Sequence, residues 1–136
     1  MPIAIELSRI ITKDLDAEQV IYLKEVGGTR GFPMLIGEFE AKTIERRVKG
    51  FVPPRPLTHD LIVSIVEHLG GQLQDVIITE LKDQTYYARL RIRHNGELIA
   101  VDCRPSDAIA VSLCCNPRLP LYIEEDVLND VLRYQQ

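Results

Sequence analysis

Several side chains suited to hydrolytic chemistry gather at one point of the sequence, where an apolar strand is expected to give way to an apolar helix. The segment Asp102-Cys103-Arg104-Pro105-Ser106-Asp107 stands between the aliphatic run 97–101 and the almost entirely apolar run 108–115. Pro105 favours the first helical turn, where its missing N–H costs nothing, and the serine and aspartate after it can accept hydrogen bonds from free amides. The pattern predicts an arginine and two carboxylates around one helix N-terminus.

A second predicted helix start carries residues that complement this set. A proline-rich connector brings Arg55 to a helix whose expected N-cap is Thr58, with His59 and Asp60 in the first turn. Of the three histidines, His59 is the best candidate for a general acid or base, because the other two are expected in a helix interior and a turn. Arg55 and Arg104 carry forked donors that could hold non-bridging phosphate oxygens.

These residue types suit phosphodiester cleavage, which needs an activated water and positive charge opposite the charge that develops in the transition state. If the two helix starts converge, Asp60, Asp102 and Asp107 could bind Mg²⁺ or Mn²⁺ through hard oxygen ligands. Glu38, in the first turn of another predicted helix, is a further candidate acid, although a simple interaction with the helix dipole is the alternative. The candidate catalytic residues are therefore His59, Asp60, Asp102, Asp107 and Glu38.

One predicted strand carries a row of arginines. The period of two places one tyrosine and three arginines on one face of the strand 86–93: Tyr87, Arg89, Arg91 and Arg93. Such a row can bind a phosphate backbone and stack a base. Alternatively, it is a solvent face whose arginines pair with acids of neighbouring strands, such as Glu80 or Glu97. On the first interpretation, the candidate substrate-binding residues are Arg55, Arg104, Ser106, Arg89 and Arg91.

The same residues also fit a purely structural role. Asp102 could form a buried ion pair with Arg104 or Arg55, while the serine and aspartates at the two helix starts act as caps. The result would be a polar lock that fixes how the helices dock. On this interpretation the chain is a non-catalytic domain that binds an anion, a nucleic acid or a protein.

The three cysteines, Cys103, Cys114 and Cys115, lie in or near the apolar helix and lack the paired spacing of metal ligands. They are expected to be reduced and mainly structural. A cysteine hydrolase built from Cys103 and His59 is a further alternative, because a neighbouring arginine and a helix N-terminus can activate a thiol.

Length and composition indicate one globular domain, residues 1–136, with 46% hydrophobic and 26% charged residues. Without a membrane-spanning run or a signal-peptide pattern, a cytoplasmic location away from the membrane is expected. The net charge is -4, with 16 basic against 20 acidic residues. This balance disfavours non-specific nucleic-acid binding, so any such binding must use local basic patches.

Periodicity predicts an α+β fold with a mixed, mainly antiparallel sheet packed by about four helices. In the second helix, Leu61, Ile65, Val66 and Leu69 are expected to form the buried face. The expected strands are 3–10, 19–26, 32–36, 76–81, 86–93, 97–103 and 119–123, and a polar connection is expected at 13–16. The expected helices are 37–49, 58–69, 105–115 and 124–132.

Three segments together resemble the bifunctional nuclease domain family: 36–41 (IGEFEA), 55–61 (RPLTHDL) and 102–110 (DCRPSDAIA). They occur in the same order as in that family, and the resemblance covers almost the whole chain. It implies a compact domain containing helices and strands, a wedge-shaped homodimer with a groove, and cleavage of both DNA and RNA.

Overall fold

The computed structural model describes residues 1–12 and 18–134; the polar connection expected at 13–16 lies outside these ranges. Seven strands form one continuous sheet in the order β3-β2-β1-β7-β4-β5-β6. Their bounds are β1 Pro2–Ile11, β2 Glu18–Glu25, β3 Gly31–Gly37, β4 Gln72–Lys82, β5 Thr85–His94, β6 Glu97–Cys103 and β7 Leu121–Glu124. Within the described ranges, β4 and β7 are the one parallel pair, so the sheet is mixed and mainly antiparallel, as predicted.

Two tight turns hold β4, β5 and β6 together as consecutive hairpins. Asp83 and Gln84 both have positive φ angles of 52° and 65°, and Asn95 and Gly96 have 50° and 78°. Two residues with positive φ define the turn whose twist matches that of the flanking strands. The second of these turns fixes the β5–β6 register, in which Arg89 lies opposite Asp102.

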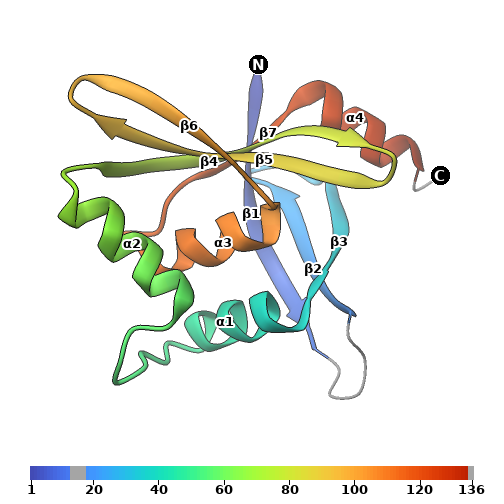
Figure 1. Ribbon diagram of the computed structural model, residues 1–136. Coiled ribbons are helices and arrows are strands. Elements are labelled where there is room, and N and C mark those ends of the chain that lie inside the picture. The colour runs from blue at the N-terminus through green and yellow to red at the C-terminus, as the bar shows by residue number, and fades with distance from the viewer. Residues whose placement is uncertain (13–17, 135–136) are drawn as a thin grey trace.

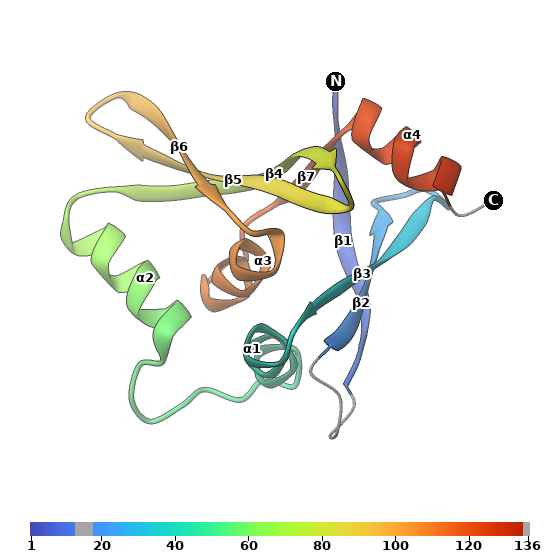
Figure 2. The ribbon, with the colours of Figure 1, turned by 45° about the vertical axis from the view of Figure 1, so that its right-hand side comes forward.

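The helices of the described chain are α1 (Glu38–Val48), α2 (Thr58–His68), α3 (Pro105–Cys114) and α4 (Glu125–Tyr134). Figure 1 shows α1, α2 and α3 together beneath β4–β6, with α4 at a different part of the sheet. In the turned view, α3 lies between α1 and α2 (Figure 2). Residues 108–111 of α3 are at most 2% exposed, because this apolar helix packs on the sheet and on both neighbouring helices.

The predicted α+β class and the central position of the apolar helix are confirmed, but the predicted buried face of α2 is wrong. Leu61, Ile65 and Leu69 are about half exposed or more, and only Val66 of the predicted set is partly buried. The buried side of α2 instead centres on His59. Thr58 is also the first helical residue rather than the N-cap, which is Leu57.

No helix in the described parts of the chain is long and apolar enough to cross a membrane.

Candidate functional site

Three polar contacts join α1, α2 and α3 pairwise. Arg47 of α1 pairs with Asp60 of α2. His59 of α2 bonds Asp107 of α3, with 3.0 Å between Nε2 and Oδ1. Arg104, the N-cap of α3, closes the triangle: its Nη2 donates to Oε1 of Glu40 in α1 at 2.5 Å. We call these contacts the helix triangle.

His59 is the member best placed for proton transfer. The residue is only 7% exposed, and Asp107 occupies its Nε2. Its other ring nitrogen, Nδ1, makes no hydrogen bond within residues 1–12 and 18–134. No enclosed side-chain nitrogen there lacks a partner, so Nδ1 must be accessible from outside the protein. His59 also lines a surface groove. The contact with the carboxylate favours a proton on Nε2, which leaves the lone pair of Nδ1 free to accept another.

Asp107 also contacts Arg104. Its Oδ2 accepts hydrogen bonds from Nε and Nη2 of Arg104 at 2.9 and 2.7 Å, whereas its Oδ1 faces His59. The Asp107 carboxylate, and after it Glu40, raises the pKa of Arg104 above its ordinary value. The aspartate thus connects the imidazole to a fixed positive charge.

Asp60 faces α1. Besides pairing with Arg47, its Oδ2 accepts the Leu57 N–H at 2.9 Å, at the start of α2. Burial raises the pKa of Asp60, but the Leu57 N–H and the charge of Arg47 lower it by more, so the net pKa is below the ordinary value. The structure therefore gives Asp60 the helix-start role that the lock interpretation predicted, with Arg47 as an unpredicted partner.

A groove of about 630 Å³ opens between α1 and the start of α2. Lys42, Arg46 and Arg55 contribute three positive charges to its lining, and His59 also borders it. Phe39 stands at its wall with 77% of its surface exposed. Although the chain as a whole is acidic, none of the described residues that line this groove carries a carboxylate, so it is a local basic patch next to an imidazole. Of its three cations, Lys42 is paired with Glu38 outside the groove.

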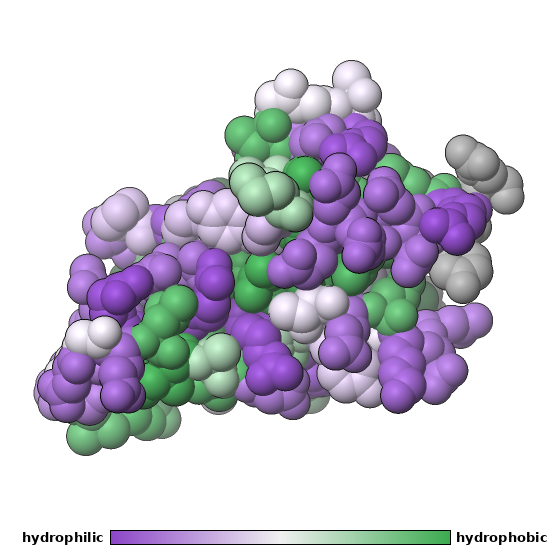
Figure 3. All heavy atoms as spheres, turned by 90° about the horizontal axis from the view of Figure 1, so that it is seen from above, coloured by the Kyte–Doolittle hydropathy of each residue, from purple (hydrophilic) through white to green (hydrophobic). Residues whose placement is uncertain are grey.

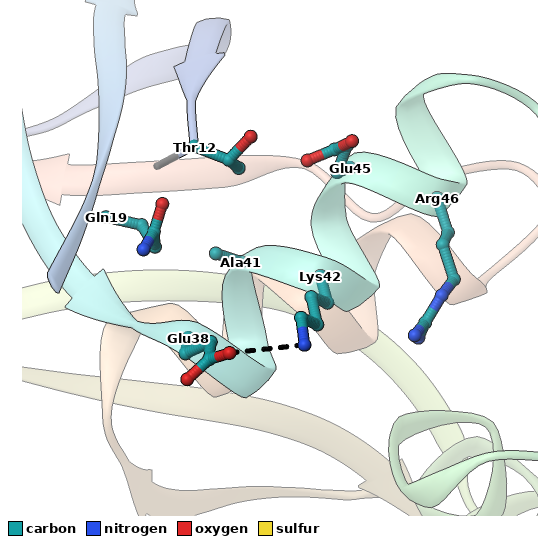
Figure 4. A pocket seen from close by; sticks show the side chains of 7 residues that line it. All are labelled: Thr12, Gln19, Glu38, Ala41, Lys42, Glu45 and Arg46. Atoms are coloured by element: carbon teal, nitrogen blue, oxygen red, sulfur yellow. Dashed lines mark ion pairs between the residues drawn. The ribbon is translucent and has the colours of Figure 1, made fainter. Parts of the chain in front are cut away.

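Glu38 belongs to a different hollow. Its carboxylate pairs with Lys42 at 3.2 Å on the surface of α1. Figure 4 shows this pair, with Thr12 and Gln19 lying across the hollow from the helix. Glu38 does not belong to the helix triangle; the acid of this segment that does is Glu40.

The arginines of β5 do not act as a uniform row. Arg91 is held by Asp75 of β4 through two hydrogen bonds of 2.5 and 2.8 Å, and Asp75 raises the pKa of Arg91. Arg89 is exposed and lies opposite the exposed Asp102. Pairing with an acid of a neighbouring strand was predicted, but the acid is Asp75 rather than Glu80 or Glu97.

Asp102 also differs from the lock interpretation. Arg104 pairs with Asp107 and Glu40, not with Asp102. The predicted side-chain cap of α3 is absent as well, because neither Ser106 nor Asp107 accepts a capping hydrogen bond. The Asp107 carboxylate instead contacts both the imidazole of His59 and the guanidinium of Arg104.

The hypothetical metal ligands do not form a site. Among the residues that the structure places, no group of three or more His, Cys, Asp or Glu side chains is arranged to hold a metal ion. Asp60 is committed to Arg47, and Asp107 to His59 and Arg104. The donor set does not fit Mg²⁺ or Mn²⁺, which prefer several converging oxygen ligands.

The cysteines are unfavourable nucleophiles. Burial, and then the charge of Asp102, raises the pKa of Cys103 to about 11. Burial likewise raises the pKa of Cys114 and Cys115 to about 11. A thiol with such a pKa is almost entirely protonated at neutral pH, whereas the thiolate is the reactive form.

The sequence analysis did not select two members of the triangle, Glu40 and Arg47, as site residues. The signal was present, because a helix with acids in its first turn and arginines in its last can pair with two different neighbours. The groove residues Phe39 and Lys42 were missed as well.

The comparisons with known proteins identify the family. The model of the bifunctional nuclease domain matches residues 21–135. The chain belongs to the bifunctional nuclease domain family. The match includes the three segments that carry the resemblance, and they supply Glu40, His59, Asp60, Arg104 and Asp107. Five of the six residues of the helix triangle therefore lie in these segments.

Relatives occur in bacteria and plants. An uncharacterized protein of Mycobacterium tuberculosis is 42% identical over 111 residues, which is 82% of this chain and 65% of that protein. Bifunctional nuclease 1 of Oryza sativa is 27% identical over 85% of this chain and 35% of its own length. Bifunctional nuclease 1 of Arabidopsis thaliana is 23% identical, with 82% and 35% covered. The chain thus spans 65% of the bacterial relative and about a third of the plant proteins.

Proposed function

We propose that this chain hydrolyses phosphodiester bonds of DNA and RNA in the groove between α1 and α2, with His59 as the general acid or base. The observation that carries the proposal is the contact of His59 with Asp107 beside a groove that has three positive side chains. Family membership and the printed names of the plant relatives support nucleic acid as the substrate.

The proposed chemistry starts with binding. Lys42, Arg46 and Arg55 attract the phosphate backbone into the groove. Nδ1 of His59 then accepts a proton from the attacking water, whose oxygen bonds to phosphorus while the P–O bond to the leaving sugar oxygen breaks. Asp107 stabilises the imidazolium, which returns the proton to the leaving oxygen. A nearby arginine such as Arg55 can stabilise the extra negative charge on the phosphate oxygens.

We route no step through a metal ion, because the candidate acids do not converge on one. Asp60, Asp102 and Glu38 therefore have no catalytic step in this proposal. Arg89 can extend the contact with nucleic acid along the sheet, since it is exposed. Arg91 cannot do so without leaving Asp75.

The rival proposal is a non-catalytic interaction domain. It is supported by the helix triangle itself, in which Glu40, Asp60 and Asp107 each contact a basic side chain or an imidazole. Such a network can serve only to fix the relative positions of three helices. The groove would then bind nucleic acid or another anion without turnover.

A homodimer is a further part of the proposal. Strand β6 is an edge strand on which Leu98, Ile99 and Val101 are each about two-fifths exposed. Hydrophobic side chains gather at the left end of the molecule in Figure 3, the end where α2 and the β5–β6 turn lie. An apolar edge strand can pair antiparallel with its own copy, which gives the self-complementary contact of a twofold dimer.

The test is cleavage of labelled single-stranded and duplex DNA and RNA by the purified protein, with Mg²⁺, Mn²⁺ or EDTA. The His59→Ala variant should lose cleavage by about a hundredfold or more. His68→Ala is the matched control, because His68 is exposed on the same helix and its hydrogen-bond partner among the described residues is Ser64, so cleavage should persist. Tight binding without cleavage under every condition would favour the interaction domain instead.

A further inference from the structure

A second hollow, of about 350 Å³, lies where α3 begins, between the edge strand β3 and the β4–β5 turn. Met34, Leu35 and Tyr86 give it an apolar wall, and Arg104 and Ser106 are among its polar residues. No acid lines it. The hollow is distinct from the groove beside His59, with which it shares no lining residue.

Ser106 is a buried residue whose hydroxyl is unused. The residue is 6% exposed, and its Oγ takes part in no hydrogen bond within the described parts of the chain. No side-chain oxygen there is both enclosed and unpaired. The Ser106 hydroxyl must therefore keep contact with open space, and the hollow that Ser106 lines provides it. A buried hydroxyl that faces a pocket without a partner is suited to a ligand.

Backbone donors gather at the same place. The first helical hydrogen bond of α3 runs from Ala108 N–H to Arg104 O. Pro105 has no N–H, and no side chain caps the helix. The N–H groups of Ser106 and Asp107 thus have no acceptor in the part of the chain that is described, at the positive end of a ten-residue helix.

Arg104 adds a guanidinium group that still has an unused hydrogen-bond donor. Its Nε and Nη2 serve Asp107 and Glu40, but Nη1 has no partner among the placed residues. Its side chain is 65% exposed. Because two carboxylates, Glu40 and Asp107, share this one guanidinium, a phosphate here must be held mainly by hydrogen bonds from the Ser106 hydroxyl, the free amides and Nη1 of Arg104. The site therefore suits one phosphate rather than a polyphosphate.

We propose that this hollow binds a single phosphate group carried by a nucleotide-sized ligand such as a nucleoside monophosphate. The phosphate contacts Arg104, the Ser106 hydroxyl and the free amides of α3, while the base and sugar lie against Leu35 and Tyr86. The volume admits more than a bare anion, and the apolar wall gives the rest of the ligand a surface to cover. The site stands apart from the proposed nuclease function, because binding here requires no cleavage.

The test is a titration of the whole chain, followed by the NMR shifts of the Ser106 and Asp107 amides. The probes are adenosine 5′-monophosphate, inorganic phosphate and adenosine. The monophosphate should bind more tightly than either fragment and should move both amide signals.

Two variants and a control locate the ligand. Ser106→Ala should weaken binding of the monophosphate about fivefold, the usual value of one hydrogen bond. Leu35→Glu places a negative charge on the exposed wall of the hollow and should weaken binding as well, without a buried change. Arg133→Gln, at an exposed arginine of α4 that lines neither hollow, should leave the affinity unchanged.

Several results would overturn the proposal. One is unmoved amide signals; another is adenosine or inorganic phosphate binding as tightly as the monophosphate. Equal affinities of the wild type, Ser106→Ala and Leu35→Glu would place the ligand elsewhere. Because the titration measures binding alone, its result is independent of whether the protein cleaves nucleic acid.

Discussion

The Arg47–Asp60 pair allows the helix triangle to be tested by stability alone. The two side chains are only 18% and 16% exposed, and Asp60 also accepts the Leu57 N–H. Asp60→Asn keeps the shape and one acceptor oxygen but removes the charge, leaving Arg47 largely buried without its counter-ion. Asp60→Ala removes the hydrogen bond at the helix start as well.

The expected magnitudes follow from these contacts. Removing one partner of a buried ion pair lowers the free energy of unfolding by about 3–5 kcal/mol. Because this pair is still partly exposed, Asp60→Asn should lower it by about 3 kcal/mol, the lower end of that range. Asp60→Ala should cost about 1 kcal/mol more, the usual value of a helix cap. The double variant Arg47→Gln/Asp60→Asn should be less destabilised than the sum of the single variants by at least about 1 kcal/mol.

The contribution of the charged Asp60 carboxylate to the free energy of unfolding should also depend on pH. Because the folded state lowers the pKa of Asp60, the charged form stabilises the fold above the ordinary titration range, near pH 4. This contribution is lost as the pH falls through the lowered pKa. The difference between wild type and Asp60→Asn should therefore be full at pH 7 and shrink below about pH 4.

Urea unfolding followed by circular dichroism at pH 7 and at about pH 3 measures these differences. The reasoning fails if Asp60→Asn costs less than about 0.5 kcal/mol at pH 7, since a change of that size is typical of a surface substitution. Additive single variants, or a difference that is the same at both pH values, would contradict it equally.

Three further predictions concern the groove, the edge strand and the thiols. Arg46→Gln and Arg55→Gln should each weaken oligonucleotide binding for all sequences alike and reduce the slope of log affinity against log salt by about one in fluorescence anisotropy; an unchanged slope would place the nucleic acid elsewhere. Ile99→Glu should convert a dimer to a monomer in light scattering, and a wild-type monomer at micromolar concentration would remove the dimer proposal. Cys103→Ala should retain full cleavage, because burial and then Asp102 raise the pKa of this thiol to about 11; a large loss would revive the cysteine mechanism.

The elements that the sequence predicted well are those that local signals determine. The strands 86–93 and 97–103 were predicted on either side of the turn dipeptide Asn95-Gly96, which joins β5 and β6 in the structure. The apolar helix α3 could be assigned to the centre of the domain because almost every side of it is apolar.

The buried face of α2 could not be predicted in the same way. Leu61 and Ile65 form an apolar stripe at helical spacing, and such a stripe is usually buried. In the structure a neighbouring side is buried instead: Ile62 and Val63 pack against the core, and Asp107 on α3 supplies the polar partner of the buried His59. Burial of a histidine depends on a residue 48 positions away, which no local pattern shows.

The sequence predicted several residues of the candidate site, but only some of the contacts between them. His59, Asp107 and Arg104 were selected, and the structure brings them together. Asp102 was chosen as a partner for Arg104, yet Glu40, 64 positions away, takes that place. Which carboxylate pairs with Arg104 depends on how α1 packs against α3. This tertiary contact cannot be predicted from the sequence of either segment alone.

The most direct test of the central claim compares two substitutions in the same network. Asp107→Asn changes the partner of His59, whereas Glu40→Gln changes the network at Arg104 without touching the imidazole. Cleavage rates should be measured for both, per folded molecule, with stability determined in parallel. If His59 and Asp107 act in catalysis, Asp107→Asn should lower the rate by about a hundredfold while Glu40→Gln retains most of it. Equal rates in the two folded variants would show that the contact only holds the helices together.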